Sequence, residues 1–242
     1  MKYTGLWVGG LCLLCACSSP QKAPIDYVDP FIGTGFHGHT YPGATAPFGA
    51  VQLSPDTRRG NWDASSGYHY SDSTILGFSH THLSGTGCQD LGDVLLRPTT
   101  QPVRTEGEGD IFLPAAFSHD SEKARPGYYA VELADEQIKV ELTATTFAGM
   151  HRYSYLNDKD ASVIVDLTHI LNTDDFIYEA EVKQTADNEL VGMRRTRSWV
   201  DNQYIYFVLQ FSKPIQELQQ LNEKQAVARF GQERELIAKV AL

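Results

Sequence analysis

Apolar residues in the second half of the chain recur at alternate positions or in short β-branched runs. From Gly127 onward, turn signals such as residues 134–136 and 157–160 separate these runs. A period of two places apolar side chains on one face of a strand, and short strands at this spacing are typical of an antiparallel sandwich. We therefore predict strands at residues 128–133, 138–145, 149–155, 162–167, 181–183, 189–194, 204–211, 226–230 and 235–242.

The first half of the chain differs in composition and in the length of its apolar runs. Residues 26–92 are rich in Gly, Pro, Ser, Thr and His, and their apolar runs are too short for amphipathic helices. This composition predicts strands joined by long, structured loops. Residues 104–110 are expected to form a solvated loop, and residues 214–225, polar with two interspersed leucines, a connection or a short helix. The predicted fold class is an all-β antiparallel β-sandwich with long loops.

The start of the chain is predicted to direct export. Lys2 precedes an apolar run at residues 6–16, which is shorter than the roughly 20 residues that a membrane-spanning helix needs. The sequence Leu-Cys-Ala-Cys at residues 14–17 resembles a lipoprotein cleavage box, in which Cys17 becomes the lipidated first residue. We predict a signal at 1–17, a tether at 18–25 and one domain at 26–242, with anchoring to the outer membrane, facing the periplasm or the outside. An ordinary cleaved signal is the alternative.

Charge and cysteine content narrow the classes of function. The chain has 20 Lys and Arg against 30 Asp and Glu, which gives a net charge of -10. This charge argues against electrostatic binding to the phosphates of nucleic acid. Once a signal is removed, Cys88 is the one cysteine outside it, so no internal disulfide is expected. Natural ends are usually polar, whereas residues 235–242 are largely apolar, so we expect a fragment that stops at a core strand.

Residues 29–93 contain the highest density of side chains that could bind a ligand or take part in catalysis. His37 with His39, and His80 with His82, have a spacing that on a strand would put both rings on one face, and together they could supply four zinc ligands. Hydrogen bonding within polar loops is the favoured interpretation, because no carboxylate or cysteine stands at a familiar metal-ligand spacing. Cys88 could be a nucleophile with a histidine base, although a lone thiol beside glycines is more often packed.

Glycine-rich and aromatic segments offer two further hypotheses. The Gly-Thr-Gly runs at 33–35 and 85–87 lack the pattern of a phosphate-binding loop, so phosphate binding is not expected. Trp62 and Tyr68 lie in glycine- and serine-rich loops and could stack on sugar rings, while Arg58, Asp63 and the histidines bind hydroxyls. Packing of the same aromatic residues in the core is an equal alternative on composition alone.

Several motifs in a fixed order carry a resemblance. They are Tyr-Val-Asp-Pro-Phe-Ile-Gly-Thr-Gly at 27–35, Pro-Gly-Ala-Thr-Ala-Pro-Phe-Gly at 42–49, Val-Gln-Leu-Ser-Pro-Asp-Thr at 51–57, Ser-Gly-Tyr at 66–68 and Gly-Phe-Ser-His-Thr-His-Leu-Ser-Gly-Thr-Gly at 77–87. This succession resembles the amino-terminal domain of glycoside hydrolase family 92, bacterial exo-acting α-mannosidases. The resemblance covers essentially the whole chain after the tether, with the specific motifs between 27 and 93.

The resemblance implies a two-part enzyme. It implies a β-sandwich of the galactose-mutarotase-like supersandwich type, packed on a carboxy-terminal (α/α)-barrel with the active site at the junction. It also implies calcium-dependent, inverting hydrolysis of mannose-containing glycans, with α-1,2 linkages the expected substrate. Inversion needs a general acid and a general base about 6.5–9.5 Å apart. In the family both groups and the calcium ligands belong to the barrel, so no carboxylate of this chain is assigned as catalytic.

What carries over is a supporting role for the loops. The resemblance implies a pocket-lining or pocket-shaping role for matching residues, with Trp62 stacking, Arg58 and Asp63 binding hydroxyls, and the histidines orienting the loop. The full set of candidate substrate-binding residues is Arg58, Trp62, Asp63, Tyr68, His80, His82 and Gly85. The fragment alone is expected to be inactive. Two alternatives remain open: a free-standing carbohydrate-binding lipoprotein without hydrolytic activity, and a zinc hydrolase.

Overall fold

The computed structural model describes residues 22–103 and 113–242. Within these ranges the chain forms strands and three short 3₁₀ helices, η1 (Pro24–Tyr27), η2 (Trp62–Ala64) and η3 (His119–Ser121). The predicted all-β class is confirmed. No helix in the described ranges is long and apolar enough to cross a membrane. The predicted signal segment and the predicted loop at 104–110 lie outside the described residues.

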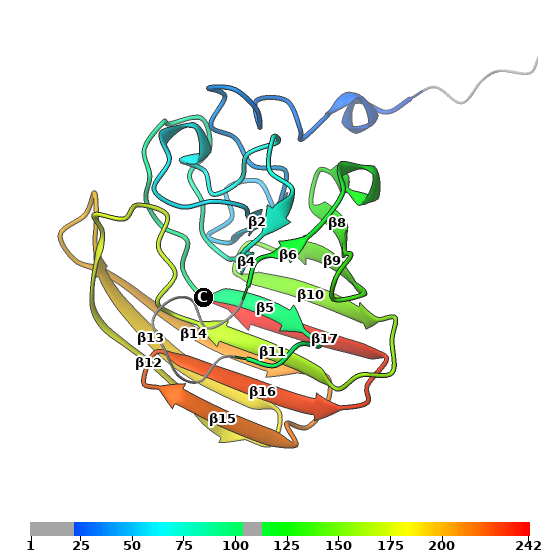
Figure 1. Ribbon diagram of the computed structural model, residues 1–242. Coiled ribbons are helices and arrows are strands. Elements are labelled where there is room, and N and C mark those ends of the chain that lie inside the picture. The colour runs from blue at the N-terminus through cyan, green and yellow to red at the C-terminus, as the bar shows by residue number, and fades with distance from the viewer. Residues whose placement is uncertain (1–21, 104–112) are drawn as a thin grey trace, which may run out of the picture.

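Two large antiparallel sheets face each other (Figure 1). The first has the strand order β1, β2, β4, β5, β11, β16, β15, and these strands span respectively Ala44–Thr45, Gln52–Asp56, Gly77–Ser79, Leu95–Thr99, Ala161–Asp166, Gln225–Gly231 and Glu217–Asn222. The second has the order β12, β13, β14, β17, β10, β9, β8, β7, spanning Phe176–Ala186, Glu189–Arg197, Gln203–Phe211, Glu235–Ala241, Ala148–Tyr155, Ile138–Ala144, Tyr128–Leu133 and Lys123–Arg125. A small third sheet pairs β3 (Thr74–Ile75) with β6 (Ala115–Ala116).

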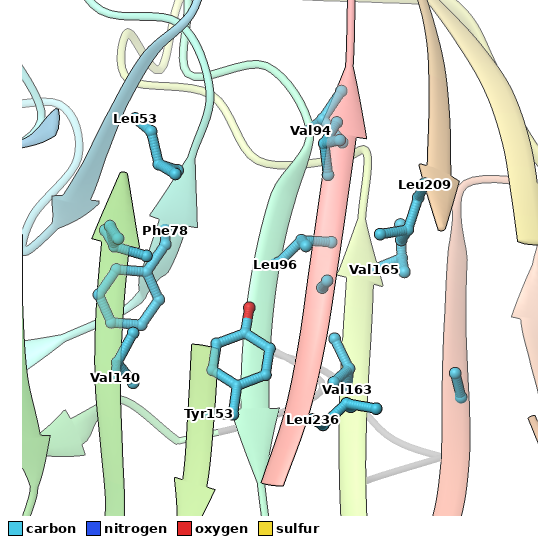
Figure 2. Packing of buried hydrophobic residues seen from close by; sticks show 14 of the residues in the cluster. Leu53, Phe78, Val94, Leu96, Val140, Tyr153, Val163, Val165, Leu209 and Leu236 are labelled. Atoms are coloured by element: carbon cyan, nitrogen blue, oxygen red, sulfur yellow. The ribbon is translucent and has the colours of Figure 1, made fainter. Parts of the chain in front are cut away.

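The hydrophobic core fills the space between the two large sheets. Along β9 the odd residues Lys139 and Glu141 point outward while Val140 and its even-numbered neighbours are buried, as a period of two requires. Figure 2 shows side chains from both sheets meeting, with Leu96 from the first sheet and Leu236 from the second among them. Burying an aliphatic side chain of this size contributes about 1.5–3 kcal/mol, so this layer is the main source of stability.

Two strand predictions need correction. The segment at 214–225, predicted as a connection or a short helix, contains strand β15 and the first residue of β16. β15 is an edge strand that pairs with β16, and no position along it is fully buried, although Leu218 packs against the core. The short strand predicted at 181–183 is part of β12, which runs for 11 residues at the edge of the second sheet. Within β12 the fully buried positions are Ala180 and Val182, so a period of two is visible in the sequence over only a short part of the strand.

Candidate functional site

The site begins with loops that backbone hydrogen bonds tie together at one end of the sandwich. The amide of Tyr70 donates to the carbonyl of Thr34 over 2.8 Å, and the amide of Gly85 donates to the carbonyl of His39 over 2.6 Å. A third bond, from Gly60 to the carbonyl of Leu171 over 2.8 Å, brings in the loop before β12. In Figure 1 the blue and cyan segments gather above β2 and β4. Segments far apart in the sequence therefore form one surface.

Backbone strain is concentrated in these loops. Of the six non-glycine residues with positive φ in the described ranges, five lie between residues 36 and 94, and they are Phe36, His39, Phe48, Leu91 and Val94. Such conformations cost about 1–3 kcal/mol each and persist where the surroundings impose them, which occurs most often at functional sites. Phe48 and Phe36 are, in addition, exposed to solvent. The loops are thus held in a fixed shape that presents side chains outward.

Trp62 and Asp63 lie together on this surface. The side chain of Asn61 caps η2 by accepting a hydrogen bond from the amide of Asp63 over 3.0 Å, which fixes both residues. The indole of Trp62 is 56% exposed, and the ring of His39 packs edge-on against it with centroids 4.2 Å apart. The carboxylate of Asp63 pairs with Nδ1 of His37. Trp62 is therefore a supported, solvent-facing platform.

Arg58 and Tyr68 are engaged in contacts within the protein. The guanidinium of Arg58 is bound by Asp72, with Nε 3.0 and 2.9 Å from the two carboxylate oxygens, and this hydrogen bonding raises its pKa above the usual range. Tyr68 is buried, and its hydroxyl donates to the carboxylate of Glu122. Burial and the Glu122 charge raise the Tyr68 pKa far above its ordinary value. Both side chains are therefore bound by protein groups in this structure, Tyr68 in the interior and Arg58 at a part-exposed position.

His80 belongs to a buried chain of hydrogen bonds that joins the two sheets. Tyr153 donates its hydroxyl proton to Nδ1 of His151 over 2.9 Å, and Nε2 of His151 lies 3.0 Å from Nε2 of His80. Nδ1 of His80 donates to the carbonyl of Val94 over 2.6 Å. The contacts assign neutral rings, with His151 donating to His80. Burial lowers the pKa of His80 to about 4, and burial together with His80 holds the pKa of His151 well below its usual range.

His82 faces a different partner, the fully buried Asp56. Its Nε2 lies 2.8 Å from a carboxylate oxygen of Asp56 and 3.0 Å from the hydroxyl of Ser79, and its Nδ1 donates to the carbonyl of Gln52 over 2.7 Å. His169 completes the cluster, with Nε2 3.0 Å from the second oxygen of Asp56. Burial would raise the pKa of Asp56, but His82 and His169 hold it well below its ordinary value. Asp56 is thus a buried anion that binds three chain segments together.

A second buried carboxylate, Asp93, anchors the loop surface to the second sheet. It accepts hydrogen bonds from the hydroxyl of Thr81 over 2.7 Å and from the side-chain amide of Gln203 over 2.9 Å. The guanidinium of Arg194 on β13 lies 3.3 Å away as an ion pair. Buried charges that lose a partner destabilise a protein by several kcal/mol, so this cluster and the Asp56 cluster fix the loops rigidly on the sandwich.

Gly85 and Cys88 lie in the loop that follows His82. Gly85 adopts a φ of +72°, and no atom lies within 4 Å of the position that a Cβ would take, so its backbone conformation is what favours glycine there. Cys88 is a free, partly exposed thiol. Burial and the nearby charges of Asp90 and Asp175 raise its pKa, which is the opposite of what a nucleophilic thiolate needs.

The predicted residues therefore fall into two groups. Trp62, Asp63 and Gly85 lie on the loop surface, whereas Tyr68, His80 and His82 are buried beneath it, and Arg58 is part-exposed and bound by Asp72. Their contact with a sugar stays a prediction. Sequence reasoning did not single out Asp56 as the buried anion that two histidines bind, nor did it include His169. No spacing signal connects His169 to the early loops, because only the tertiary fold brings it there.

The two histidine pairs do not converge on a common point. In residues 22–103 and 113–242, no three His, Cys, Asp or Glu side chains form a group that could hold a metal ion. His80 and His82 bond to separate partners, and Nδ1 of His37 is engaged with Asp63. The arrangement that the zinc hypothesis requires is therefore not formed by these residues.

One groove lies away from this surface. It has a volume of about 650 Å³ and runs between η1 and the turn that joins β7 to β8, lined in part by Ile25, Asp26, Arg125 and Tyr128. None of its lining residues is a predicted site residue. Its lining includes neither the non-glycine residues with positive φ nor the buried ion pairs that distinguish the surface around Trp62.

The fold and the loops define a β-sandwich domain that presents a rigid, aromatic-bearing surface at one end. The family model of the "Glycosyl hydrolase family 92 N-terminal domain" matches residues 27–240. The chain therefore belongs to glycoside hydrolase family 92, as its amino-terminal domain. The resemblance drawn from the sequence motifs is confirmed.

Similar proteins extend this assignment. The chain is 34% identical to the family GH92 α-mannosidase BT3965 from Bacteroides thetaiotaomicron, solved in complex with mannoimidazole, with a TM-score of 0.81 over 90% of this chain and 32% of that one. The GH92 family glycosyl hydrolase ccman5 is 28% identical, with a TM-score of 0.77 over 90% and 32%. An uncharacterized secreted glycosidase of Arthroderma benhamiae is 30% identical over 70% of this chain and 23% of its own. The chain thus spans a third or less of the length of these relatives.

Proposed function

We propose that this chain is the amino-terminal domain of a calcium-dependent, inverting exo-α-mannosidase, and that its loop surface forms one wall of the mannose pocket. The observation that carries the proposal is the family match over residues 27–240. The similar structures include an α-mannosidase solved in complex with mannoimidazole. The rigid platform at Trp62 supports it, because aromatic rings suit the C–H faces of sugars. The expected substrate is a mannose-containing glycan with α-1,2 linkages.

The catalytic acid, the catalytic base and the calcium ligands are proposed to lie in a carboxy-terminal (α/α)-barrel domain. The carboxylates of the loop surface support this division of roles. Asp56 and Asp93 are buried in ionic clusters, and Asp63 is paired with His37. A general acid needs a raised pKa, whereas that of Asp56 is depressed. The described residues also form no group fit for a metal ion, so no step is assigned here to calcium.

Export is part of the same proposal. A relative is described as a secreted glycosidase, and the sequence motif at residues 14–17 would make Cys17 a lipid anchor to the outer membrane. Labelling cells with a radioactive fatty acid tests this anchor, since Cys17→Ser should abolish incorporation into the protein. Incorporation that persists in Cys17→Ser would contradict it.

The proposed activity is tested by hydrolysis of an α-1,2-linked mannobiose. We expect turnover by a form that includes the carboxy-terminal domain, loss of turnover with a calcium chelator, and none by residues 1–242 alone. In the longer form Trp62→Ala should lower kcat/KM by about tenfold, because a stacking contact is worth roughly 1–1.5 kcal/mol. Trp199→Ala, which removes another exposed indole, is the matched control and should leave it unchanged. Equal losses in both variants, or chelator-insensitive turnover, would contradict the proposal.

A further inference from the structure

The ring of His37 is partly exposed and is held in one orientation by Asp63. Its Nδ1 is bound by the carboxylate of Asp63, and because a carboxylate accepts, Nδ1 carries the proton. Nε2 is then the ring nitrogen that is left to bind a ligand. No hydrogen bond to Nε2 is formed by the residues that the structure describes, and the side chain is 49% exposed. An oriented hydrogen-bonding nitrogen is thus available at the surface.

The surroundings of His37 are aromatic. Its ring lies 5.3 Å from that of Trp62 and 3.9 Å from that of Phe36, measured between centroids. Both neighbours are themselves exposed, and Phe36 is held in a positive-φ conformation. A flat apolar surface beside a few oriented polar atoms is the combination that binds a sugar ring, because each hydroxyl needs a partner and the C–H face needs an apolar one.

We propose that His37 hydrogen-bonds a hydroxyl of a hexose stacked on Trp62, and that Asp63 acts by orienting His37 and does not itself contact the sugar. This inference rests on the proposed function and assigns roles within its pocket wall. Nε2 forms the hydrogen bond with the hydroxyl. Asp63 is then a positioning residue, which differs from the hydroxyl-binding role that the sequence predicted for it.

Two substitutions of His37 separate ligand binding from structural pairing. In His37→Gln the terminal amide occupies the place of Nε2, whereas in His37→Asn it occupies the place of Nδ1. Binding of methyl α-mannoside to the full chain is followed by the fluorescence of Trp62, with Trp7 and Trp199, the other two of its 3 tryptophans, replaced by Phe. We expect about five- to tenfold weaker binding in His37→Asn and near-parent affinity in His37→Gln, since one hydrogen bond is worth about 1 kcal/mol.

A double-mutant cycle tests the role of Asp63. If it acts through His37, then Asp63→Ala, His37→Ala and the double variant all weaken binding by about the same factor. Multiplied losses in the double variant would show direct sugar contact by Asp63 and overturn its positioning role. His119→Asn is the matched control, because His119 is another part-exposed histidine paired with a carboxylate, Glu122, and it should leave affinity unchanged.

The outcomes separate this inference from the proposed function. Equal affinities of the Gln and Asn variants, or better binding by Asn, overturn the role of His37 even when mannobiose is hydrolysed by the longer form. An absence of mannoside binding by the parent chain also overturns it. If the longer form does not hydrolyse mannobiose, or hydrolyses it equally well with a chelator, the proposed function is contradicted instead. Binding that is strong in His37→Gln and weak in His37→Asn supports the inference.

Discussion

At the scale of single residues, Asp56 controls how closely the loops approach one another. Its carboxylate is held by His82 and His169, and it occupies the space where Gly67 would carry a side chain. A Cβ on Gly67 would overlap an oxygen of Asp56, and Gly67 has a φ of +88°. The position therefore demands glycine for both space and backbone conformation. The surface at Trp62 depends on this buried contact, because η2 lies just before Gly67.

Replacement of Gly67 by alanine should consequently destabilise the domain strongly. The left-handed conformation costs about 1–2 kcal/mol for alanine, and displacement of the buried Asp56 adds at least as much. We expect a loss of about 3–5 kcal/mol in the free energy of unfolding, measured by urea denaturation. Gly127→Ala is the control, because Gly127 has a φ of +74° and nothing lies within 4 Å of its Cβ position. Equal losses in the two variants would show that the contact with Asp56 is unimportant.

The same residues show how far a sequence can predict a site. Trp62, an aromatic residue among glycines and serines, is exposed on the loop surface, whereas its contact with a sugar stays a prediction. The spacing of His80 and His82 was uninformative about their partners, because both follow the end of β4 and are not on a regular strand. Their rings therefore diverge, His80 to His151 and His82 to Asp56. Contacts of this kind depend on tertiary packing, which no local pattern encodes.

At the scale of elements, the turn between β8 and β9 connects the two sheets. The sequence predicted residues 134–136 as a turn, and this is confirmed, but Glu136 is 3% exposed. Its carboxylate accepts hydrogen bonds from Thr99 at 2.8 Å, from the amide of Thr100 at 2.8 Å and from the guanidinium of Arg97 at 3.2 Å. Polar turn signals predict reversal of the chain, not burial, so this role was invisible in the sequence.

The Glu136→Ala variant should therefore lose about 3–5 kcal/mol of stability, since it removes the carboxylate that the buried guanidinium of Arg97 faces. The adjacent Asp135→Ala is the control. Asp135 is exposed and accepts a hydrogen bond from the amide of Ala116 at 3.1 Å, so a loss of about 0.5–1.5 kcal/mol is expected. Urea midpoints of the two variants give the comparison. A larger loss for Asp135→Ala would contradict a connecting role for Glu136.

At the scale of the whole molecule, the two facing sheets could be predicted from the sequence, but the polar contacts that join the sheets could not. Strands with one buried face, such as β9 and β10, stand out by alternation, and their predicted and observed positions agree to within one residue at an end. These contacts are the Glu136 turn, the Asp93 cluster and the hydrogen-bonded chain from Tyr153 through His151 to His80. The last of these consists of titratable rings, and so it links the stability of the sandwich to pH.

The direction of this pH dependence follows from the two pKa values. His80 is neutral in the fold down to about pH 4 but protonates near 6.5 when unfolded. Between these values the unfolded chain binds more protons, so acidification favours unfolding. His80 alone should remove roughly 2 kcal/mol between pH 7 and pH 5, and His151, shifted in the same direction, adds to this loss.

Other groups act outside this window or in the opposite direction. Asp56, with its depressed pKa, loses its contribution only below about pH 4. Burial raises the pKa of Asp175 to about 6, so its uptake of a proton opposes the loss from the histidines. Urea unfolding at pH 7 and pH 5 is therefore compared in Asp175→Asn, where this opposing effect is absent. We expect a drop of at least about 2 kcal/mol, and a clearly smaller drop when His151→Gln and His80→Gln are added. Equal stability at the two pH values in Asp175→Asn would show that the histidine chain is not neutral in the fold.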